Sequence, residues 1–209
     1  MDKKTNELMK EFFDSKAEIW DDKKKVVPDY VRELFDKYVK RSSRVLDIAC
    51  GTGIIDKELS LRDPHLVLAI DLSDKMIEKA NNKNNCENVE YKVADFYTLD
   101  EGKFDLAVMY NSYIHFIYKE ELCKKLYETL NENGRFLIIN NSDYKVLNKN
   151  HQNPYEEKIS IQLKSTDEEK EYFIKYFDVD VSITTADKYI LSGVKKKKKT
   201  GAVKKWKIS

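Results

Sequence analysis

The sequence predicts an α/β fold in which helices cover both faces of a mostly parallel, Rossmann-like sheet. Short apolar runs alternate with segments of helical periodicity between residues 44 and 140. These runs have the length of buried strands and are too short to cross a bilayer. After residue 178 the pattern changes to two alternating segments joined by a polar turn, which predicts an antiparallel hairpin that closes the sheet.

Two amphipathic helices are expected before the first strand. The first has apolar side chains three and four residues apart over residues 8–13 and continues towards Trp20. The second covers residues 30–39, with Pro28 where the first helical turn tolerates a proline. We expect the aromatic side chains of both helices mainly in the core, whereas Trp20 suits either core packing or a lid over a ligand.

Five strands and three helices are expected in the parallel part of the sheet. The strands are predicted at residues 45–49, 66–70, 89–94, 104–110 and 135–140. The helices are predicted at residues 54–61, 74–82 and 120–130. Ser73 is placed to cap the second of these helices, and Asn133-Gly134 is expected to make the turn into the fifth strand.

The C-terminal part predicts one helix and the hairpin. Thr166 and Glu169 have the spacing of a capping box ahead of a helix that is expected to end near Phe177. Residues 179–183 then alternate as a strand, and residues 189–194 return as its partner after a turn.

Composition and cysteine usage predict a folded cytoplasmic protein. The 209 residues are 41% hydrophobic and 36% charged, which is ordinary for a globular domain. The N-terminus lacks the apolar run of a secretory signal. Cys50, Cys86 and Cys123 are odd in number and far apart, which suits neither a disulfide framework nor a zinc site.

The net charge of +1 hides an asymmetry. Residues 195–209 contain eight lysines and no acid, so residues 1–194 carry about −7. An acidic body argues against nucleic-acid binding over a broad surface. We expect the lysine-rich tail to be a solvated end. Attraction of RNA or anionic lipid to the tail and an extension of the last strand remain open.

The most informative motif covers residues 45–53, where a buried strand passes through Asp47 into a turn containing Gly51 and Gly53, just before a helix. Glycines allow a close approach of the backbone to a ligand, and the start of a helix offers free N–H groups to an anion. A nicotinamide dinucleotide site usually has a third glycine, and Asp56 stands in its place. An NAD-linked oxidoreductase is therefore disfavoured.

Two further elements follow at the ends of the next strands. Asp71 comes 20 residues after the first glycine of the turn, where a carboxylate can accept hydrogen bonds from ribose hydroxyls. Leu72 and Met76 follow it and offer apolar surface to an adenine ring. Asp95 and Phe96 come after the third strand, where the carboxylate can meet the adenine amino group. The three elements are expected to converge on one crevice.

These motifs make the sequence resemble class I S-adenosylmethionine-dependent methyltransferases, particularly those similar to quinone-biosynthesis methyltransferases. The resemblance extends over residues 12–194 and is carried by residues 45–53, 69–76, 94–96, 104–116 and 130–139. It implies a seven-stranded sheet of order 3-2-1-4-5-7-6 with strand seven antiparallel. It also implies three parts: an N-terminal helical lid (1–42), the methyltransferase domain (43–194) and the lysine-rich tail (195–209).

The resemblance implies S-adenosylmethionine as the cofactor and S-adenosylhomocysteine as its product. Asp47 and Gly51 would hold the methionine end, Asp71 the ribose, and Asp95 the adenine. The full set of residues expected at the cofactor is Asp47, Ala49, Gly51, Gly53, Asp71, Leu72, Met76, Asp95, Phe96 and Asn111.

Two histidines are candidates for catalysis. His115 follows the fourth strand and His151 follows the fifth, and these strands are expected to be neighbours. Either imidazole could act as a base or contact the substrate. Asp143 is the one obvious extra ligand nearby, so no metal is expected. The substrate pocket is expected to be lined by Trp20, Tyr110, Tyr113 and Phe116.

The sequence therefore predicts a methyltransferase that acts on a small molecule by in-line displacement, mainly through proximity and orientation. An RNA or protein acceptor remains an alternative, because the lysine-rich tail could guide it. The Asn/Asp-Pro-Pro-Tyr motif of nucleic-acid amino-methylating enzymes is replaced by Tyr-Asn-Ser-Tyr at residues 110–113. A protein of the same fold that binds the cofactor without catalysis is the other alternative.

Overall fold

The computed structural model describes residues 3–22 and 26–197. The strands are β1 Arg44–Ile48, β2 Leu66–Asp71, β3 Val89–Val93, β4 Phe104–Tyr110, β5 Leu130–Asn140, β6 Phe177–Thr185 and β7 Lys188–Lys195. The α-helices are α1 Lys3–Lys16, α2 Asp29–Tyr38, α3 Asp56–Ser60, α4 Asp74–Lys83, α5 Lys119–Thr129, α6 Tyr144–Asn150 and α7 Thr166–Phe173. Short 3-10 turns are η1 Ala17–Ile19, η2 Phe96–Thr98, η3 Tyr113–His115 and η4 Glu156–Lys158.

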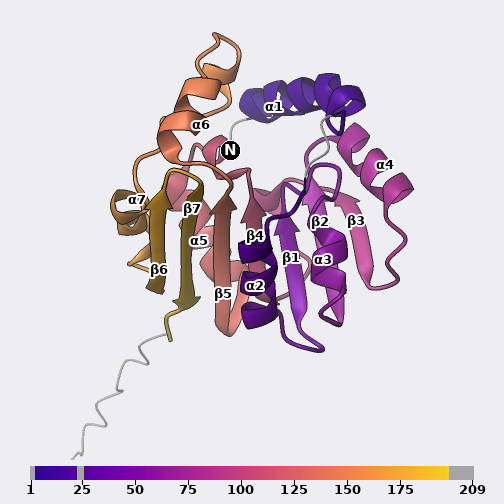
Figure 1. The fold of residues 1–209 in the computed structure, drawn as a ribbon, viewed down its shortest axis with the longest axis vertical. Coiled ribbons are helices and arrows are strands. Elements are labelled where there is room, and N and C mark those ends of the chain that lie inside the picture. Colours follow the sequence, from indigo (N-terminus) through magenta and orange to yellow (C-terminus); the bar gives the residue numbers. More distant parts are fainter. Residues whose placement is uncertain (1–2, 23–25, 198–209) are drawn as a thin grey trace, which may run out of the picture.

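All seven strands form one sheet, in the order β3-β2-β1-β4-β5-β7-β6 (Figure 1). Pairing is parallel from β3 to β5. It is antiparallel on both sides of β7, which returns along the sheet from the β6 hairpin. The predicted strand order and the antiparallel seventh strand are confirmed.

Side chains that alternate along the central strands divide the core into two layers. Val45 packs with the apolar faces of α2 and α3, whereas its neighbour Leu46 packs with those of α5 and α7. Figure 1 shows α2 and α3 in front of the sheet and α5 behind it. Helices therefore cover both faces, which explains why the central strands are apolar throughout.

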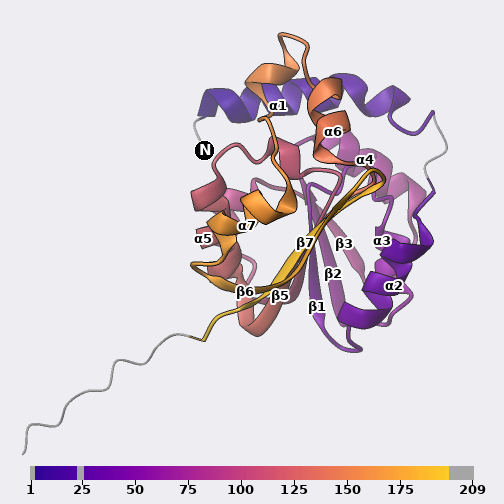
Figure 2. The ribbon, with the colours of Figure 1, turned by 60° about the vertical axis from the view of Figure 1, so that its left-hand side comes forward.

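A roof of two chain segments lies over the carboxyl ends of the parallel strands. In both views α1 crosses above the sheet beside α6 (Figures 1 and 2). The ring of Tyr155 stacks on Phe12 with centroids 5.4 Å apart, and its hydroxyl donates to the Leu8 carbonyl at 3.0 Å. The start of the chain is thereby joined to the segment that follows β5.

The C-terminal helix differs from its prediction. The capping box is formed by Ser165 and Glu168, one residue before the predicted pair Thr166 and Glu169. Ser165 has the extended backbone of an N-cap residue, so Thr166 is already the first helical residue. The helix also ends before the predicted position, because Phe177 begins β6.

The predicted turn at Asn133-Gly134 lies within β5 and not ahead of it. The pairing of β5 with β4 skips from Leu130 to Arg135, so the residues between them bulge out of the ladder. Asn133 is left-handed, with φ 62°, a conformation that asparagine tolerates. A Cβ on Gly134 would lie 2.9 Å from the carbonyl oxygen of Asn131, so a side chain there would clash with backbone.

The last strand extends into the lysine-rich segment. Lys195 ends β7, and its ammonium donates to the Leu130 carbonyl at 2.7 Å. Residues 198–209 lie outside the described residues, so the predictions for that part of the lysine-rich tail also fall outside them and stay predictions. Within residues 3–22 and 26–197, no helix is both long and apolar enough to span a membrane.

A buried ion pair joins α5 to α7 behind the sheet. The Lys119 ammonium lies 3.7 Å from a Glu169 carboxylate oxygen, and the two side chains are 6% and 3% exposed. The Tyr113 hydroxyl donates to the same oxygen at 2.8 Å, and the Lys164 N–H donates to the other at 3.2 Å. Burial lowers the pKa of Lys119 to about 7. The Glu169 carboxylate thus links α7, η3 and α5.

Glu169→Ala should lower the free energy of unfolding by about 3 kcal/mol, because it leaves the Lys119 ammonium buried without a counter-ion. The loss should be smaller at pH 9 than at pH 6, since Lys119 sheds its proton between them. Urea unfolding followed by circular dichroism measures both values. Lys119→Met in the Glu169→Ala background should restore part of the stability, and a double variant no more stable than Glu169→Ala would contradict this account.

Candidate functional site

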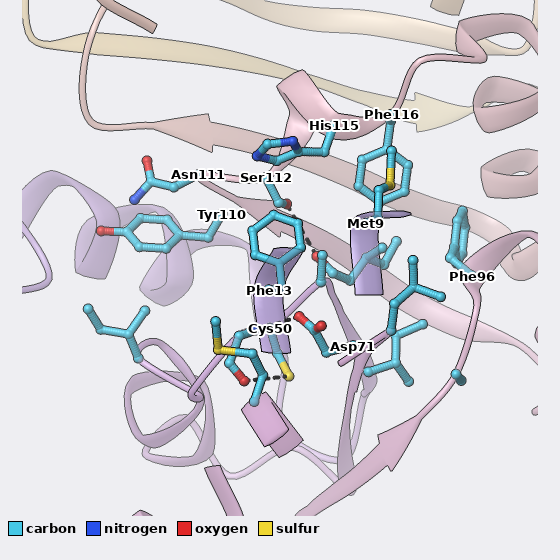
Figure 3. Close-up of a pocket in the computed structure, with 18 of the residues that line it drawn as sticks. Met9, Phe13, Cys50, Asp71, Phe96, Tyr110, Asn111, Ser112, His115 and Phe116 are labelled. Carbon is cyan, nitrogen blue, oxygen red and sulfur yellow. Dashed lines mark hydrogen bonds between the residues drawn. The ribbon is translucent and has the colours of Figure 1, made fainter. Parts of the chain in front are cut away.

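A cavity that is partly open to solvent lies between α1 and the carboxyl ends of β1, β2 and β4 (Figure 3). Open parallel sheets bind ligands at this edge, where the strand order reverses. The predicted residues that line it are Trp20, Ala49, Gly51, Asp71, Leu72, Met76, Asp95, Phe96, Tyr110, Asn111, His115 and Phe116. The predicted residues that are not part of the lining are Asp47, Gly53, Tyr113 and His151.

The turn after β1 brings main chain to the cavity wall. Ala49, Gly51 and Gly53 are all left-handed, with φ of 58°, 57° and 74°. A Cβ on Gly53 would lie 2.7–2.8 Å from the ends of three polar side chains, which would have to move, and its positive φ also favours glycine. A Cβ on Gly51 would meet only the Trp20 indole nitrogen, at 3.5 Å, so φ and not space requires glycine there. Because Ala49 is not a glycine, its left-handed backbone is strained, and this strained residue lies at the wall of the cavity.

Asp71 ends β2 with its carboxylate against the cavity wall. One oxygen accepts the Gly51 N–H at 2.9 Å, and the other accepts the Ser73 N–H at 2.9 Å. Each oxygen keeps a lone pair for a further donor. Burial raises the pKa of Asp71, and the backbone N–H groups of Ser73 and Gly51 oppose this rise. The carboxylate is thus oriented to receive a ligand with hydroxyl donors.

Asp95 and Asn6 form a second group of acceptors. One Asp95 oxygen caps η2 by accepting the Tyr97 N–H at 2.9 Å, and the other accepts the Asn6 side-chain amide at 2.7 Å. The Asn6 Oδ1 is buried without a hydrogen-bond partner in the described part of the chain. An amide oxygen next to a carboxylate suits an exocyclic amino group. No sequence signal marked Asn6, because α1 reaches Asp95 only through the tertiary fold.

Helix α1 is held over the cavity by polar contacts. The Ser73 hydroxyl, which also caps α4 as predicted, donates to Asp14 at 2.5 Å. Lys10 pairs with Asp14 at 2.7 Å. Met9 and Phe13 extend from α1 into the cavity (Figure 3). Phe13 was expected mainly in the core and Met9 was not singled out, and the structure adds both to the site.

His115 ends η3 and lines the cavity between Asn111 and Phe116 (Figure 3). Its Nδ1 lies 3.0 Å from the Ile159 carbonyl, which assigns the proton to Nδ1 and leaves Nε2 as an acceptor. The ring of Phe13 meets the imidazole edge-on at 5.1 Å. Burial lowers the pKa of His115 to about 4, so the imidazole is neutral at physiological pH.

His151 lies behind His115, just outside the cavity. The centroids of the two imidazoles are 5.2 Å apart, so the neighbouring strands bring the two histidines together, but only His115 lines the cavity. Nδ1 of His151 lies 2.8 Å from the Leu147 carbonyl. Within the described residues, no three His, Cys, Asp or Glu side chains are grouped so that they could hold a metal.

A network of polar side chains lies at the end of the cavity opposite to Phe96 (Figure 3). The Asn141 side-chain amide donates to the Tyr110 hydroxyl at 2.5 Å and accepts from the Tyr30 hydroxyl at 2.7 Å. The Asn141 N–H donates to the Asn111 side chain at 2.9 Å. Asn111 is left-handed, with φ 53°. Asn141 was not predicted, because it follows β5 without a recognisable motif.

Asp47 does not reach the cavity. Alternation along β1 turns its carboxylate towards Asp56 of α3, and both acids are buried. Burial raises the pKa of Asp47 well above its usual range and that of Asp56 to about 6. The pair therefore shares a proton close to the glycine turn, and Asp47 can act on a ligand only through that turn.

Tyr113 lies in the core and not in the substrate pocket where the sequence placed it. Its ring is fully buried, and its hydroxyl is bound to Glu169. The tight η3 turn sends Tyr113 and His115 in different directions, so only His115 reaches the cavity.

The chain matches a family model described as a methyltransferase domain over residues 45–134. A ribosomal protein L11 methyltransferase from Staphylococcus carnosus is 34% identical over 116 residues, which cover 52% of this chain and 36% of that protein. A carboxy-S-adenosyl-L-methionine synthase from Nautilia profundicola is 29% identical over 153 residues, covering 66% of this chain and 65% of that protein. The chain thus spans less than two thirds of the length of either relative.

Among solved structures, the complex of DhpI with S-adenosylhomocysteine superposes with a TM-score of 0.72 at 16% identity. The match covers 92% of this chain and 98% of that one. At this identity the likeness shows the fold, which includes the antiparallel seventh strand and the helices on both faces.

His115→Phe should reduce the loss of stability in acid. The folded pKa of His115 is about 4 and its ordinary value is 6.5. Neutral His115 therefore contributes stability above pH 6.5, and this contribution is lost as the pH falls towards 4. Between pH 7 and about pH 4.5 the wild type should lose about 2–3 kcal/mol more than His115→Phe in urea unfolding. The exposed His65 serves as the control, and His65→Phe should follow the wild type. Parallel curves for wild type and His115→Phe would contradict the buried, neutral imidazole.

Proposed function

Residues 45–134 are a methyltransferase domain of the class I S-adenosylmethionine-dependent family, and on that premise we propose that the whole chain transfers a methyl group from S-adenosylmethionine to a small-molecule acceptor. The observation that supports this best is the pair of carboxylates, Asp71 and Asp95, on the wall of the cavity beside the glycine turn. One end of the cavity suits a nucleoside, and the other end leaves room for an acceptor.

The side chains present fit the cofactor part by part. The open lone pairs of Asp71 suit two ribose hydroxyls. Asp95 and the orphaned Asn6 oxygen suit the adenine amino group. The close approach of the main chain at Gly51 to the cavity suits the methionine end of the cofactor. Apolar contact with the adenine is assigned to Leu72, Met76 and Phe96, whereas Ala49 and Asn111 border the methionine end, and Asp47 and Gly53 support the turn.

S-adenosylmethionine, when bound, supplies a methyl group already activated by its sulfonium centre. The chain's own part is to position the acceptor and exclude water. Helix α1 covers the cavity, and Phe13 reaches into it from above. The aromatic faces of Trp20, Tyr110 and Phe116 line the same space and favour a nearby cation. We assign His115 as the catalytic group, because it lines the cavity, and His151 as its neighbour.

A small acceptor is favoured over the larger ones suggested by the relatives. The cavity is covered by α1, whose Met9 and Phe13 line it, and α1 is tied to Tyr155, which leaves little room for a loop of another protein. No lysine or arginine of the described residues lines the cavity. The described lining therefore offers no cationic side chain to an additional carboxylate on the cofactor, as the name of the synthase relatives describes. These observations favour plain S-adenosylmethionine and a small acceptor.

Asp71→Ala should weaken the binding of S-adenosylmethionine and S-adenosylhomocysteine by about 30- to 100-fold, because it removes a charged acceptor of ribose hydrogen bonds. Isothermal titration calorimetry measures this loss, with NAD as the control ligand. Asp100→Ala, at an exposed acid outside the cavity lining, should bind like the wild type. Binding of NAD as tight as that of S-adenosylhomocysteine, or unchanged affinity in Asp71→Ala, would refute the cofactor assignment.

A further inference from the structure

We propose that the acceptor is a neutral molecule with a flat apolar body and a hydroxyl or thiol group that donates a hydrogen bond to Nε2 of His115. This inference rests on the proposed function. It concerns the acceptor end of the cavity, which is lined by Phe13, Tyr110, Asn111, His115, Phe116 and Asn141. In Figure 3 Tyr110 and Asn111 lie on the far side of the cavity from Phe96, next to His115.

The acceptor end carries no charge. Among the described residues that line the cavity there is no lysine or arginine, and the two carboxylates, Asp71 and Asp95, lie at the nucleoside end. Burial keeps His115 neutral, with a pKa of about 4. A carboxylate or phosphate group would meet no lysine or arginine among the described lining residues, and an ammonium group would lie close to the sulfonium cation of the cofactor. The charge distribution therefore selects a neutral molecule.

The hydrogen-bonding pattern selects a donor. Nδ1 of His115 is engaged by the Ile159 carbonyl, so Nε2 is an acceptor, and no described residue donates to it. The neighbouring polar groups are satisfied among themselves, since Asn141 binds both Tyr110 and Asn111. Nε2 is thus the acceptor that this end of the cavity offers to a ligand, and a ligand that donates a hydrogen bond to it gains over one that does not.

The surrounding rings select a flat apolar body. Phe13 packs edge-on against the His115 ring with centroids 5.1 Å apart and an interplanar angle of 89°. Phe116 lies to the right of the imidazole in the view of Figure 3, and Phe13 lies below it. Aromatic rings in such arrangements favour a planar apolar partner. Phe13 and Met9 of α1 line the same cavity, so the helix limits the room left for this body.

Proton balance distinguishes a hydroxyl or thiol from an amine. Transfer to a hydroxyl forms an O–CH₃ bond, breaks the C–S bond with its electron pair remaining on sulfur, and releases the hydroxyl proton. A methylated oxygen or sulfur that still holds its proton is a very strong acid, so even a weakly basic imidazole accepts the proton at Nε2. A methylated ammonium is a far weaker acid and would keep it. The low basicity of His115 therefore fits oxygen or sulfur as the acceptor atom.

The test uses the full chain saturated with S-adenosylhomocysteine at neutral pH and three naphthalene probes that share one flat body. 2-Naphthol has a donor, 2-methoxynaphthalene has none, and 2-naphthoate is an anion. Ligand-observed NMR titrations should give a dissociation constant for 2-naphthol at least tenfold lower than for either of the others. In His115→Phe the advantage of 2-naphthol over 2-methoxynaphthalene should disappear, whereas His65→Phe should retain it.

Binding of S-adenosylhomocysteine to each protein is measured first by calorimetry. If the wild type does not bind it, the proposed function fails and the inference fails with it. If the wild type binds it, three results overturn the inference alone. These are equal binding of 2-naphthoate and 2-naphthol, an unchanged preference for 2-naphthol in His115→Phe, and no binding of any of the three probes.

Discussion

The Asp71 carboxylate joins the two structural elements on which the site depends. By accepting the N–H groups of Gly51 and Ser73, it connects the turn after β1 to the start of α4 at the end of β2. Ser73 in turn caps α4 and binds Asp14 of α1. The buried Asp71 carboxylate thus fixes the conformation of the turn and the position at which α4 begins. Through Ser73 it also helps to fix how close α1 lies to the sheet. Removing its charge would affect binding and local geometry together.

The two ends of the cavity are built by different physical means. The nucleoside end is formed by strand termini, so its carboxylates and backbone N–H groups are held by the sheet itself. The acceptor end is formed by η3, Asn141 and α1, which are joined to the sheet by side-chain hydrogen bonds and by the buried Glu169 cluster. In a scaffold of this kind the nucleoside end of the cavity can stay the same, whereas substitution of a few side chains changes the acceptor end.

The parts of the fold with a local cause were predictable. Strand–helix alternation predicted the parallel sheet, and Ser73 was recognised as a cap because its hydroxyl acts within one helical turn. Asp71 and Asp95 were found because strand ends converge in a parallel sheet. Asn6 and Asn141 were missed, since each joins the site through a contact more than 25 residues away along the chain. Tyr113 was misplaced because a single 3-10 turn decides which of two nearby rings faces the cavity.

The roof over the site has a consequence for the order of folding. Tyr155 and Leu8 are bonded across a separation of 147 residues, so closing this contact carries a large loop entropy and has to wait until most of the chain is available. During synthesis, the first helix emerges long before its partner exists. Strands β1 to β5 and the carboxylates at their ends can form in the meantime, and the enclosed site is completed only after Tyr155 has emerged. Contacts that form last and rest on few tethers are also the first to open locally, so cofactor exchange can proceed by lifting the roof while the sheet stays folded.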